Sequence, residues 1–219
     1  HAGGDATGRE LMTVLAAAVG ASPHVGWLAG HELQGIGFSG DGRVAAVRVA
    51  DDAGGTDVLA TADLVLATGG IGALFESTTN PEGADGAGLA LALAAGAQGR
   101  DLEFIQWHPT AFALPAARHL PLVTEALRGA GATLVGDDGA ALMPGTHPLG
   151  DLAPRDIVAR RLWRHRRAGG RAWLDARMLD APAWRQFPGV LATCAGSGID
   201  PRREHIPVTP AVHFHMGGI

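Results

Sequence analysis

The chain has 219 residues, of which 47% are hydrophobic and 18% charged, a composition that supports a buried core. Its net charge of −5 disfavours nucleic acid and anionic lipid as partners. Every basic residue is arginine, which excludes a Schiff-base lysine and a P-loop lysine. The single cysteine, Cys194, excludes an internal disulfide and a multi-cysteine metal site, so we expect a cytoplasmic protein. No apolar run is long enough for a membrane span.

Hydrophobic spacing predicts a mixture of helices and strands along the chain. Apolar residues at helical spacing predict helices over residues 5–19, 86–97 and 154–168, with one or two more between residues 175 and 195. Around the turn Gly40-Asp41-Gly42, residues 43–49 and 57–60 are predicted to form small antiparallel strands. A predicted buried strand follows over residues 64–67. Residues 206–219 are proline-spaced and predicted to be extended.

The predicted strand over residues 64–67 ends in Thr68-Gly69-Gly70, where little more than backbone would crowd a ligand. Glycines at such a point allow a nucleotide cofactor to approach closely, but in a chain with 33 glycines a simple tight turn is the alternative. Further on, Asp85 and Gly86 precede the predicted helix over residues 86–97. They offer an acceptor and free amides at its first turn.

Two strings in the middle of the chain carry residues that suit carboxylate chemistry. His108 precedes a proline, which favours an extended backbone and places it in a loop or at a strand end; a lone histidine is usually structural. Thr124, Glu125 and Arg128 bring a hydroxyl, a carboxylate and a guanidinium together within five residues. They either bind a substrate carboxylate or form a surface turn with a local ion pair.

Arg155 lies in the first turn of the helix predicted over residues 154–168, where the backbone amides already favour an anion. A guanidinium at this position can bind a carboxylate through two parallel hydrogen bonds. The same helix carries five more arginines, which form either a nucleic-acid patch or a solvated face. The negative net charge and the lack of interleaved aromatic residues favour the solvated face.

His213 and His215 flank Phe214, so on a strand both rings would point to one side and could share a metal ion. A metal site would need a third ligand, and no carboxylate lies nearby in the sequence. We therefore predict no metal.

Seven strings, in this order, resemble the flavoprotein family that contains L-aspartate oxidase and the flavoprotein subunits of succinate dehydrogenase and fumarate reductase. They are residues 1–9 (HAGGDATGR), 67–70 (ATGG), 78–88 (TTNPEGADGAG), 102–110 (LEFIQWHPT), 124–129 (TEALRG), 149–160 (LGDLAPRDIVAR) and 207–218 (PVTPAVHFHMGG). Within the family, the strings DATGR, TEALRG and APRDIVAR are more similar to L-aspartate oxidase than to the dehydrogenases.

The resemblance implies FAD as cofactor and a small dicarboxylate, L-aspartate, fumarate or succinate, as substrate. The implied activity is oxidation of L-aspartate to iminoaspartate in NAD biosynthesis; the alternatives are fumarate or succinate chemistry and a non-catalytic remnant. Arg155 matches the family's active-site arginine, whereas His215 matches no site position. The family's flavin contacts fall on Ala67, Thr68, Gly69, Gly70 and Asp85. Its dicarboxylate site falls on His108, Thr124, Glu125 and His213.

The implied fold class is α/β, with a partial Rossmann-like FAD-binding domain and an α+β capping domain. We expect the FAD-binding part over residues 1–100, the cap over residues 101–205, and a return to the FAD-binding domain over residues 206–219. No Gly-x-Gly-x-x-Gly strand-turn-helix that could replace the family's first βαβ unit is found in these residues. We therefore expect an internal portion of a longer enzyme, which binds FAD weakly or not at all and is inactive alone. Ala130 replaces a glutamate of the family pattern, and Ala84 a glycine.

Overall fold

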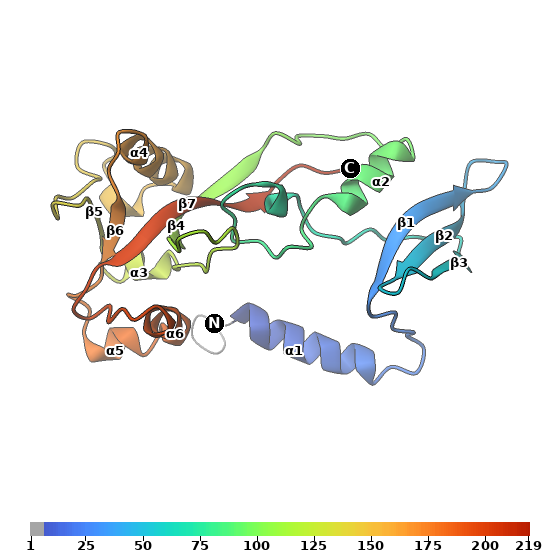
Figure 1. Ribbon diagram of the computed structural model, residues 1–219, viewed down its shortest axis with the longest axis horizontal. Coiled ribbons are helices and arrows are strands. Elements are labelled where there is room, and N and C mark those ends of the chain that lie inside the picture. The colour runs from blue at the N-terminus through green and yellow to red at the C-terminus, as the bar shows by residue number, and fades with distance from the viewer. Residues whose placement is uncertain (1–6) are drawn as a thin grey trace.

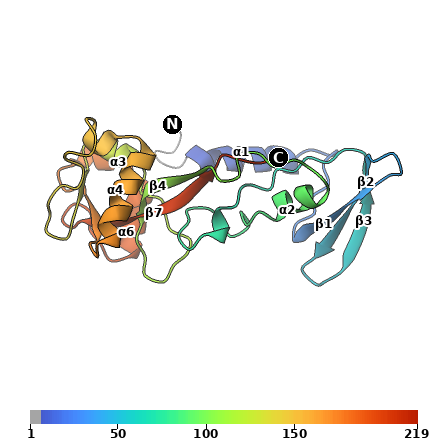
Figure 2. The same cartoon turned by 90° about the horizontal axis from the view of Figure 1, so that it is seen from above.

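The computed structural model describes residues 7–219 and shows an elongated molecule with a sheet towards each end (Figures 1 and 2). The predicted mixture of helix and sheet is confirmed. The helices are α1 (Thr7–Gly20), α2 (Ala87–Ala94), α3 (Ala126–Gly129), α4 (Arg155–Arg167), α5 (Ala181–Trp184) and α6 (Pro188–Gly196), with short 3-10 turns at Gly72–Leu74 and Gly150–Leu152. The strands are β1 (His31–Phe38), β2 (Val44–Asp51), β3 (Thr56–Ala60), β4 (Ile105–Phe112), β5 (Thr133–Val135), β6 (Ala172–Asp175) and β7 (Ile206–His215).

The smaller sheet has the order β1-β2-β3 and is antiparallel throughout. The predicted antiparallel strands are confirmed, because residues 43–49 and 57–60 correspond to β2 and β3. The sequence analysis missed β1, which pairs with the other side of β2 and places Ile36 opposite Val47. Only β2 has buried residues in this sheet, and β3 is exposed along its whole length.

The predicted buried strand over residues 64–67 is wrong. These residues form no strand, and the side chain of Val65 is 87% exposed. No backbone group from Leu64 to Gly70 hydrogen-bonds to another residue within the described range 7–219. A buried strand needs a neighbouring strand for its N–H and C=O groups, and none of the described strands lies beside this segment. The apolar pattern was correct for a strand, but the described residues include no partner for it.

The larger sheet has the order β4-β7-β6-β5 and is also antiparallel. Its main hydrophobic core is formed by residues between Phe112 and Val208, and α4 contributes Val158 and Leu162 to it. Pro154 precedes α4 and Gly169, with φ +90°, follows it, so the sequence sets both ends of the helix. The residue that begins this helix, Arg155, is thereby held beside β4 and β7 (Figure 1).

The other predicted helices are found with slightly shifted ends. The helix predicted over residues 5–19 begins at Thr7, the first described residue, and residues 5 and 6 lie outside the described range. The helix predicted over residues 86–97 is α2, and the helices predicted between residues 175 and 195 are α5 and α6. No helix in the described part of the chain is long and apolar enough to cross a membrane.

The C-terminal residues belong mainly to the larger sheet. β7 lies between β4 and β6, and beyond it Gly218 exchanges two backbone hydrogen bonds with Arg100. The division into an FAD-binding part over residues 1–100, a cap over residues 101–205 and a return segment stays a prediction.

Candidate active site

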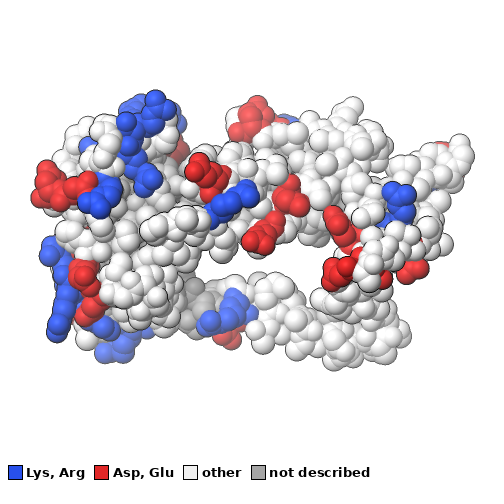
Figure 3. All heavy atoms as spheres, in the orientation of Figure 1, with Lys and Arg blue, Asp and Glu red and all other residues white. Residues whose placement is uncertain are grey.

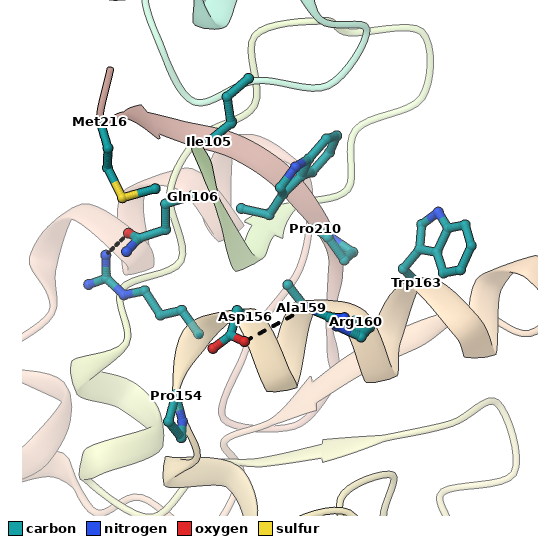
Figure 4. A pocket seen from close by; sticks show the side chains of 11 residues that line it. Ile105, Gln106, Pro154, Asp156, Ala159, Arg160, Trp163, Pro210 and Met216 are labelled. Carbon is teal, nitrogen blue, oxygen red and sulfur yellow. Dashed lines mark hydrogen bonds and ion pairs between the residues drawn. The ribbon is translucent and has the colours of Figure 1, made fainter. Parts of the chain in front are cut away.

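Arg155 connects the start of α4 to two other segments. Its Nε donates a hydrogen bond of 2.6 Å to Oε2 of Glu125, and its Nη1 donates one of 2.8 Å to Oε1 of Gln106 on β4. Figure 4 shows the second bond as a dashed line to Gln106. The side chain is 34% exposed, so the guanidinium is fixed by two partners while part of it still faces solvent. This arrangement suits a residue that must present a fixed positive charge to a ligand.

Glu125 is also close to a second arginine, Arg128. The distance from Glu125 Oε1 to Arg128 Nη2 is 3.8 Å, and Nη1 of Arg128 donates to the carbonyl oxygen of Asp151. Arg128 is buried, and its Nε and Nη2 have no hydrogen-bond partner among the described residues. Burial lowers the pKa of Arg128, while the neighbouring Glu125 and Asp151 act in the opposite direction. The string over residues 124–129 thus contains the local ion pair of Glu125 and Arg128, but its arginine is buried rather than at the surface.

His108 and His213 form a second cluster close to Arg155. Their ring centroids lie 5.1 Å apart, on the neighbouring strands β4 and β7. Burial, followed by the charges of His213, Arg155 and Arg128, lowers the pKa of His108 to about 3. Burial and Arg155 also lower the pKa of His213. His108 is consequently neutral at pH 7.

The hydrogen bonds of His108 define which of its nitrogens can meet a ligand. Its Nδ1 accepts from the backbone N–H of Thr110 at 3.2 Å, so the neutral ring carries its proton on Nε2. This Nε2 is buried and has no partner within residues 7–219. His108 lies inside β4 rather than in a loop or at a strand end, and the strand register shifts between His108 and Ala111. An unpaired buried donor is costly, so an acceptor from a ligand would stabilise the site.

The remaining predicted residues of this group are held by local contacts. His213 Nδ1 lies 2.7 Å from the hydroxyl of Thr79, and His215 Nε2 lies 3.1 Å from the carbonyl oxygen of Leu102. The two histidines thus have separate partners, and no group of three metal-ligating side chains occurs among the described residues. Thr124 is half-buried, and its hydroxyl accepts from the N–H of Ala126 at 3.3 Å, beside Glu125.

A cavity of about 680 Å³ lies against Arg155 and the first half of α4. Figure 4 shows that side chains from β4, α4 and the end of β7 surround it. It is lined by Ile105, Gln106, Trp107, Pro154, Arg155, Asp156, Ala159, Arg160, Trp163, Pro210 and Met216. Of the predicted substrate residues only Arg155 lines it, whereas Glu125, His108 and His213 lie behind or beside the arginine.

The predicted flavin residues form a separate, exposed segment. Ala67, Thr68 and Gly69 are exposed, and Gly69 has φ +79°, which favours glycine. A Cβ on Gly88 of α2 would lie 2.1 Å from the hydroxyl oxygen of Thr68, and a Cβ on Gly70 would lie 2.9 Å from Cβ of His215. One side of the segment is therefore packed closely against α2 and the end of β7. Asp85 is exposed and accepts from the N–H of Ala87 at 2.9 Å, at the start of α2.

Comparison with known proteins defines the family. The profile of a family described as FAD binding domain matches residues 1–219. The chain belongs to this FAD-binding family. It is 46% identical over 221 residues to L-aspartate oxidase of Caulobacter vibrioides and 45% identical over 222 residues to that of Mycobacterium bovis. These matches cover 99% and 100% of the chain but 42% and 41% of the relatives, so the chain spans about two fifths of their length.

Solved structures of this FAD-binding family have the same fold. A quinol-fumarate reductase matches with a TM-score of 0.76 and 32% identity over 86% of the chain and 36% of its own length. The Sdh1 complex of Mycobacterium smegmatis matches with a TM-score of 0.67, at 32% identity, over 86% of the chain and 32% of its own length. The predicted family and its α/β fold class are confirmed.

The exposed segment has properties that fit a cofactor of this FAD-binding family. The backbone N–H groups of Thr68, Gly69 and Gly70 are free of hydrogen bonds within residues 7–219 and are available to an acceptor. A Cβ added to Gly69 would contact only Cβ of Ala84, at 3.9 Å, so the outer side of the turn is open. FAD is thus consistent with these residues, and their individual assignment to it stays a prediction.

Sequence reasoning missed Gln106, which orients Arg155, and Thr79, which holds His213. Gln106 stands two residues before His108 on β4, but the strand register shifts between Gln106 and Trp107, so regular alternation does not connect the two side chains. Thr79 is separated from His213 by 134 residues, and no local pattern connects them. Arg128 was recognised, but its complete burial was not expected.

Proposed function

We propose that the whole protein containing this chain is a cytoplasmic, FAD-dependent L-aspartate oxidase that converts L-aspartate to iminoaspartate in NAD biosynthesis. The observation that carries the proposal is the position of Arg155, held by Glu125 and Gln106 next to a buried, neutral His108. This combination offers a fixed cation and an unpaired N–H donor, which together suit a dicarboxylate. The names of the 43–46% identical relatives favour L-aspartate among the dicarboxylates.

In this proposal His108 binds one carboxylate of the substrate. A neutral ring with its proton on Nε2 donates to a carboxylate oxygen, which gives the unpaired donor its partner. At the same end of the site, the hydroxyl of Thr124 donates to the substrate. Glu125 accepts a hydrogen bond from Arg155 and so fixes the position of the guanidinium. His213, fixed by Thr79, positions the other end of the substrate.

Arg155 has two roles in the proposal. Oxidation of an amine carbon to an imine removes a hydride and a proton, and FAD, when bound, supplies the hydride acceptor. The first role of Arg155 is to bind a carboxylate through its guanidinium and to stabilise negative charge that develops in the transition state. Its second role is to pass the substrate proton inward. Nε of Arg155 gives its proton to the Glu125 carboxylate, 2.6 Å away, as the guanidinium takes up the substrate proton, so the proton ends on Glu125. Arg128, 3.8 Å from Glu125, has no acceptor and takes no part in the transfer.

A second candidate, fumarate or succinate chemistry, is favoured by the 32% identity and TM-score of 0.76 to the quinol-fumarate reductase. The two are separated in a whole enzyme in which these 219 residues replace the matching segment of the Caulobacter vibrioides oxidase. We expect flavin-containing protein that turns over L-aspartate. Turnover of succinate but not of L-aspartate would support the second candidate, and a flavin-loaded protein inactive on both would indicate a non-catalytic remnant.

The 219-residue chain alone is predicted not to retain FAD and to be inactive. The only predicted flavin contacts in it are the residues 67–70 and Asp85, and few contacts cannot offset the cost of immobilising a large cofactor. The absorbance of the purified chain after gel filtration checks this. Stoichiometric yellow flavin would contradict the prediction.

A further inference from the structure

We propose that the C-terminal end of α4 carries a binding site for a mononucleotide, separate from the candidate active site. A shallow hollow of about 320 Å³ opens there between the last turn of the helix and the segment that leads into β6. It is lined by Trp163, Arg166, Arg167, Gly170 and Arg171. Two guanidinium groups without a carboxylate partner among the described residues, those of Arg166 and Arg167, and the indole ring of Trp163 around a single hollow match the phosphate and the base of a nucleotide.

The hollow carries uncompensated positive charge. Within residues 7–219, neither Arg166 nor Arg167 has a carboxylate partner. Arg171 is already engaged elsewhere, because its Nε donates to Asp137 at 2.8 Å and its guanidinium carbon lies 5.2 Å from the ring centroid of Trp173. Figure 3 shows arginine side chains gathered over the α4 end of the molecule. In a chain with a net charge of −5, this local excess singles out the hollow as an anion site.

On one side of the hollow, the side chains of Arg167 and Trp163 already lie against each other. The guanidinium carbon of Arg167 lies 5.3 Å from the ring centroid of Trp163, one helical turn earlier, and Trp163 is 53% exposed. Arginine planes and indole rings both stack against nucleic-acid bases. A base bound here would therefore meet a stacking surface directly beside the phosphate-binding arginines.

The backbone holds the third arginine next to the helix. Gly169 has φ +90°, and a Cβ added to Gly170 would lie 2.3 Å from Nε2 of His165. The same His165 Nε2 lies 3.0 Å from the carbonyl oxygen of Arg171. Two consecutive glycines thus let the chain fold back tightly on α4, so that Gly170 and Arg171 line the hollow together with the last turn of the helix.

Size and charge favour a single nucleotide over a polymer. A volume of about 320 Å³ lies at the lower end of small-molecule sites, which take about 300–1,000 Å³. The acidic net charge of the chain opposes a long polyanion. The hollow also shares Trp163 with the larger cavity at Arg155, so a ligand bound here would lie against one wall of that cavity.

Titration calorimetry of the 219-residue chain tests the proposal, with ADP, adenosine and pyrophosphate as probes. We expect saturable binding of ADP that weakens at least about tenfold in the double variant Arg166→Gln/Arg167→Gln. Trp163→Leu should weaken ADP and leave pyrophosphate unchanged. The control is Arg202→Gln/Arg203→Gln, which removes the same charge from two exposed arginines that pair with Asp200, and it should bind ADP within about twofold of the original chain.

Any of the following results would overturn the proposal: no saturable ADP binding, equal losses in the double variant and its control, no effect of Trp163→Leu, and tighter binding of an oligonucleotide than of ADP. Circular dichroism establishes that each variant is folded. If the double variant is not, the single variant Arg166→Gln, at an exposed position of α4, gives the same comparison. Pyrophosphate binding that matches ADP binding would show a bare anion site and also contradict the proposal.

Discussion

The two halves of the molecule differ in how they bury their apolar side chains. Between Phe112 and Val208, strands and helices enclose one core, in which Leu134, Leu162 and Leu174 are fully buried. In the first hundred residues, α1 has no buried residue, and its Leu11, Met12, Val14 and Leu15 are all exposed. Figure 3 shows an open gap between α1 and the middle of the molecule. An apolar pattern can thus predict a helix correctly even where the described residues include no surface against which the apolar side of that helix packs.

The residues of the candidate active site are divided between the well-packed half and the poorly packed half of the molecule. Arg155, Glu125, His108 and His213 are attached to the larger sheet or its helices, where the core holds them. The predicted flavin residues 67–70 lie in the half whose apolar side chains remain exposed. We therefore expect the substrate side of the site to keep its geometry in this chain more firmly than the flavin side.

Hydrogen exchange should show the largest difference between the halves. An isolated helix of 14 residues is marginally stable in water, so the amides of α1 should exchange almost as fast as in an unfolded chain, and so should those of residues 64–70. The central amides of β6 and β7 should exchange at least about a thousandfold more slowly, because they open only when the core unfolds. Mass spectrometry of exchanged peptides measures both. Equal protection of α1 and β7 would contradict the comparison.

Matched leucine-to-alanine variants sharpen the same comparison. Leu174→Ala empties a fully buried position of the core and should lower the free energy of unfolding by about 2–5 kcal/mol. Leu15→Ala, at a position that is 49% exposed on α1, should change it by less than about 0.5 kcal/mol. Urea unfolding followed by tryptophan fluorescence gives both values. Similar losses in the two variants would mean that α1 is packed in solution.

Acid should destabilise the packed half through His108. Its pKa is about 3 in the folded chain and near 6.5 when unfolded, so between these values the unfolded chain binds more protons. The free energy of unfolding should therefore fall as the pH is lowered from 6.5 to 4.5, by up to about 1.4 kcal/mol per pH unit from this residue. His213, whose pKa is also lowered, acts in the same direction. The carboxyl of Asp175 contributes only at lower pH, because its pKa falls from 3.8 to about 2.

Urea unfolding of His108→Gln at several pH values isolates this contribution. The variant should show a shallower dependence than the original chain between pH 6.5 and 4.5. His24→Gln, on an exposed loop, should leave the dependence unchanged. A slope for His108→Gln equal to that of the original chain would show that His108 is not buried in the neutral form.

The structure could be predicted from the sequence where it depends on residues that are neighbours along the chain. Pro154 and Gly169 set the ends of α4, so the position of Arg155 at its start could be predicted. The resemblance then identified His108, Glu125 and His213, which the structure brings near Arg155. The site roles of all these residues, and of Thr124, Asp85 and residues 67–70, stay predictions, because no contact in this chain distinguishes a ligand-binding role from a local one.

The features that sequence reasoning missed depend on distant residues. The bond from Arg155 to Gln106 spans 49 positions, and no helical or strand period predicts it. The buried strand predicted over residues 64–67 was wrong for a related reason, since a strand needs partners that its own residues do not specify.

In the proposed oxidation of L-aspartate, Arg155 positions charge and moves a proton. The most direct test is the rate at which L-aspartate reduces the flavin in single-turnover experiments. These experiments compare the whole enzyme in which these 219 residues replace the matching segment of the Caulobacter vibrioides oxidase with its Arg155→Lys variant. Lysine keeps the charge but lacks the planar guanidinium that contacts both Glu125 and Gln106. We expect unchanged flavin content and a rate lowered at least about a hundredfold, which is about 2.7 kcal/mol. A near-normal rate in the variant would contradict this role and leave Arg155 a structural residue at the start of α4.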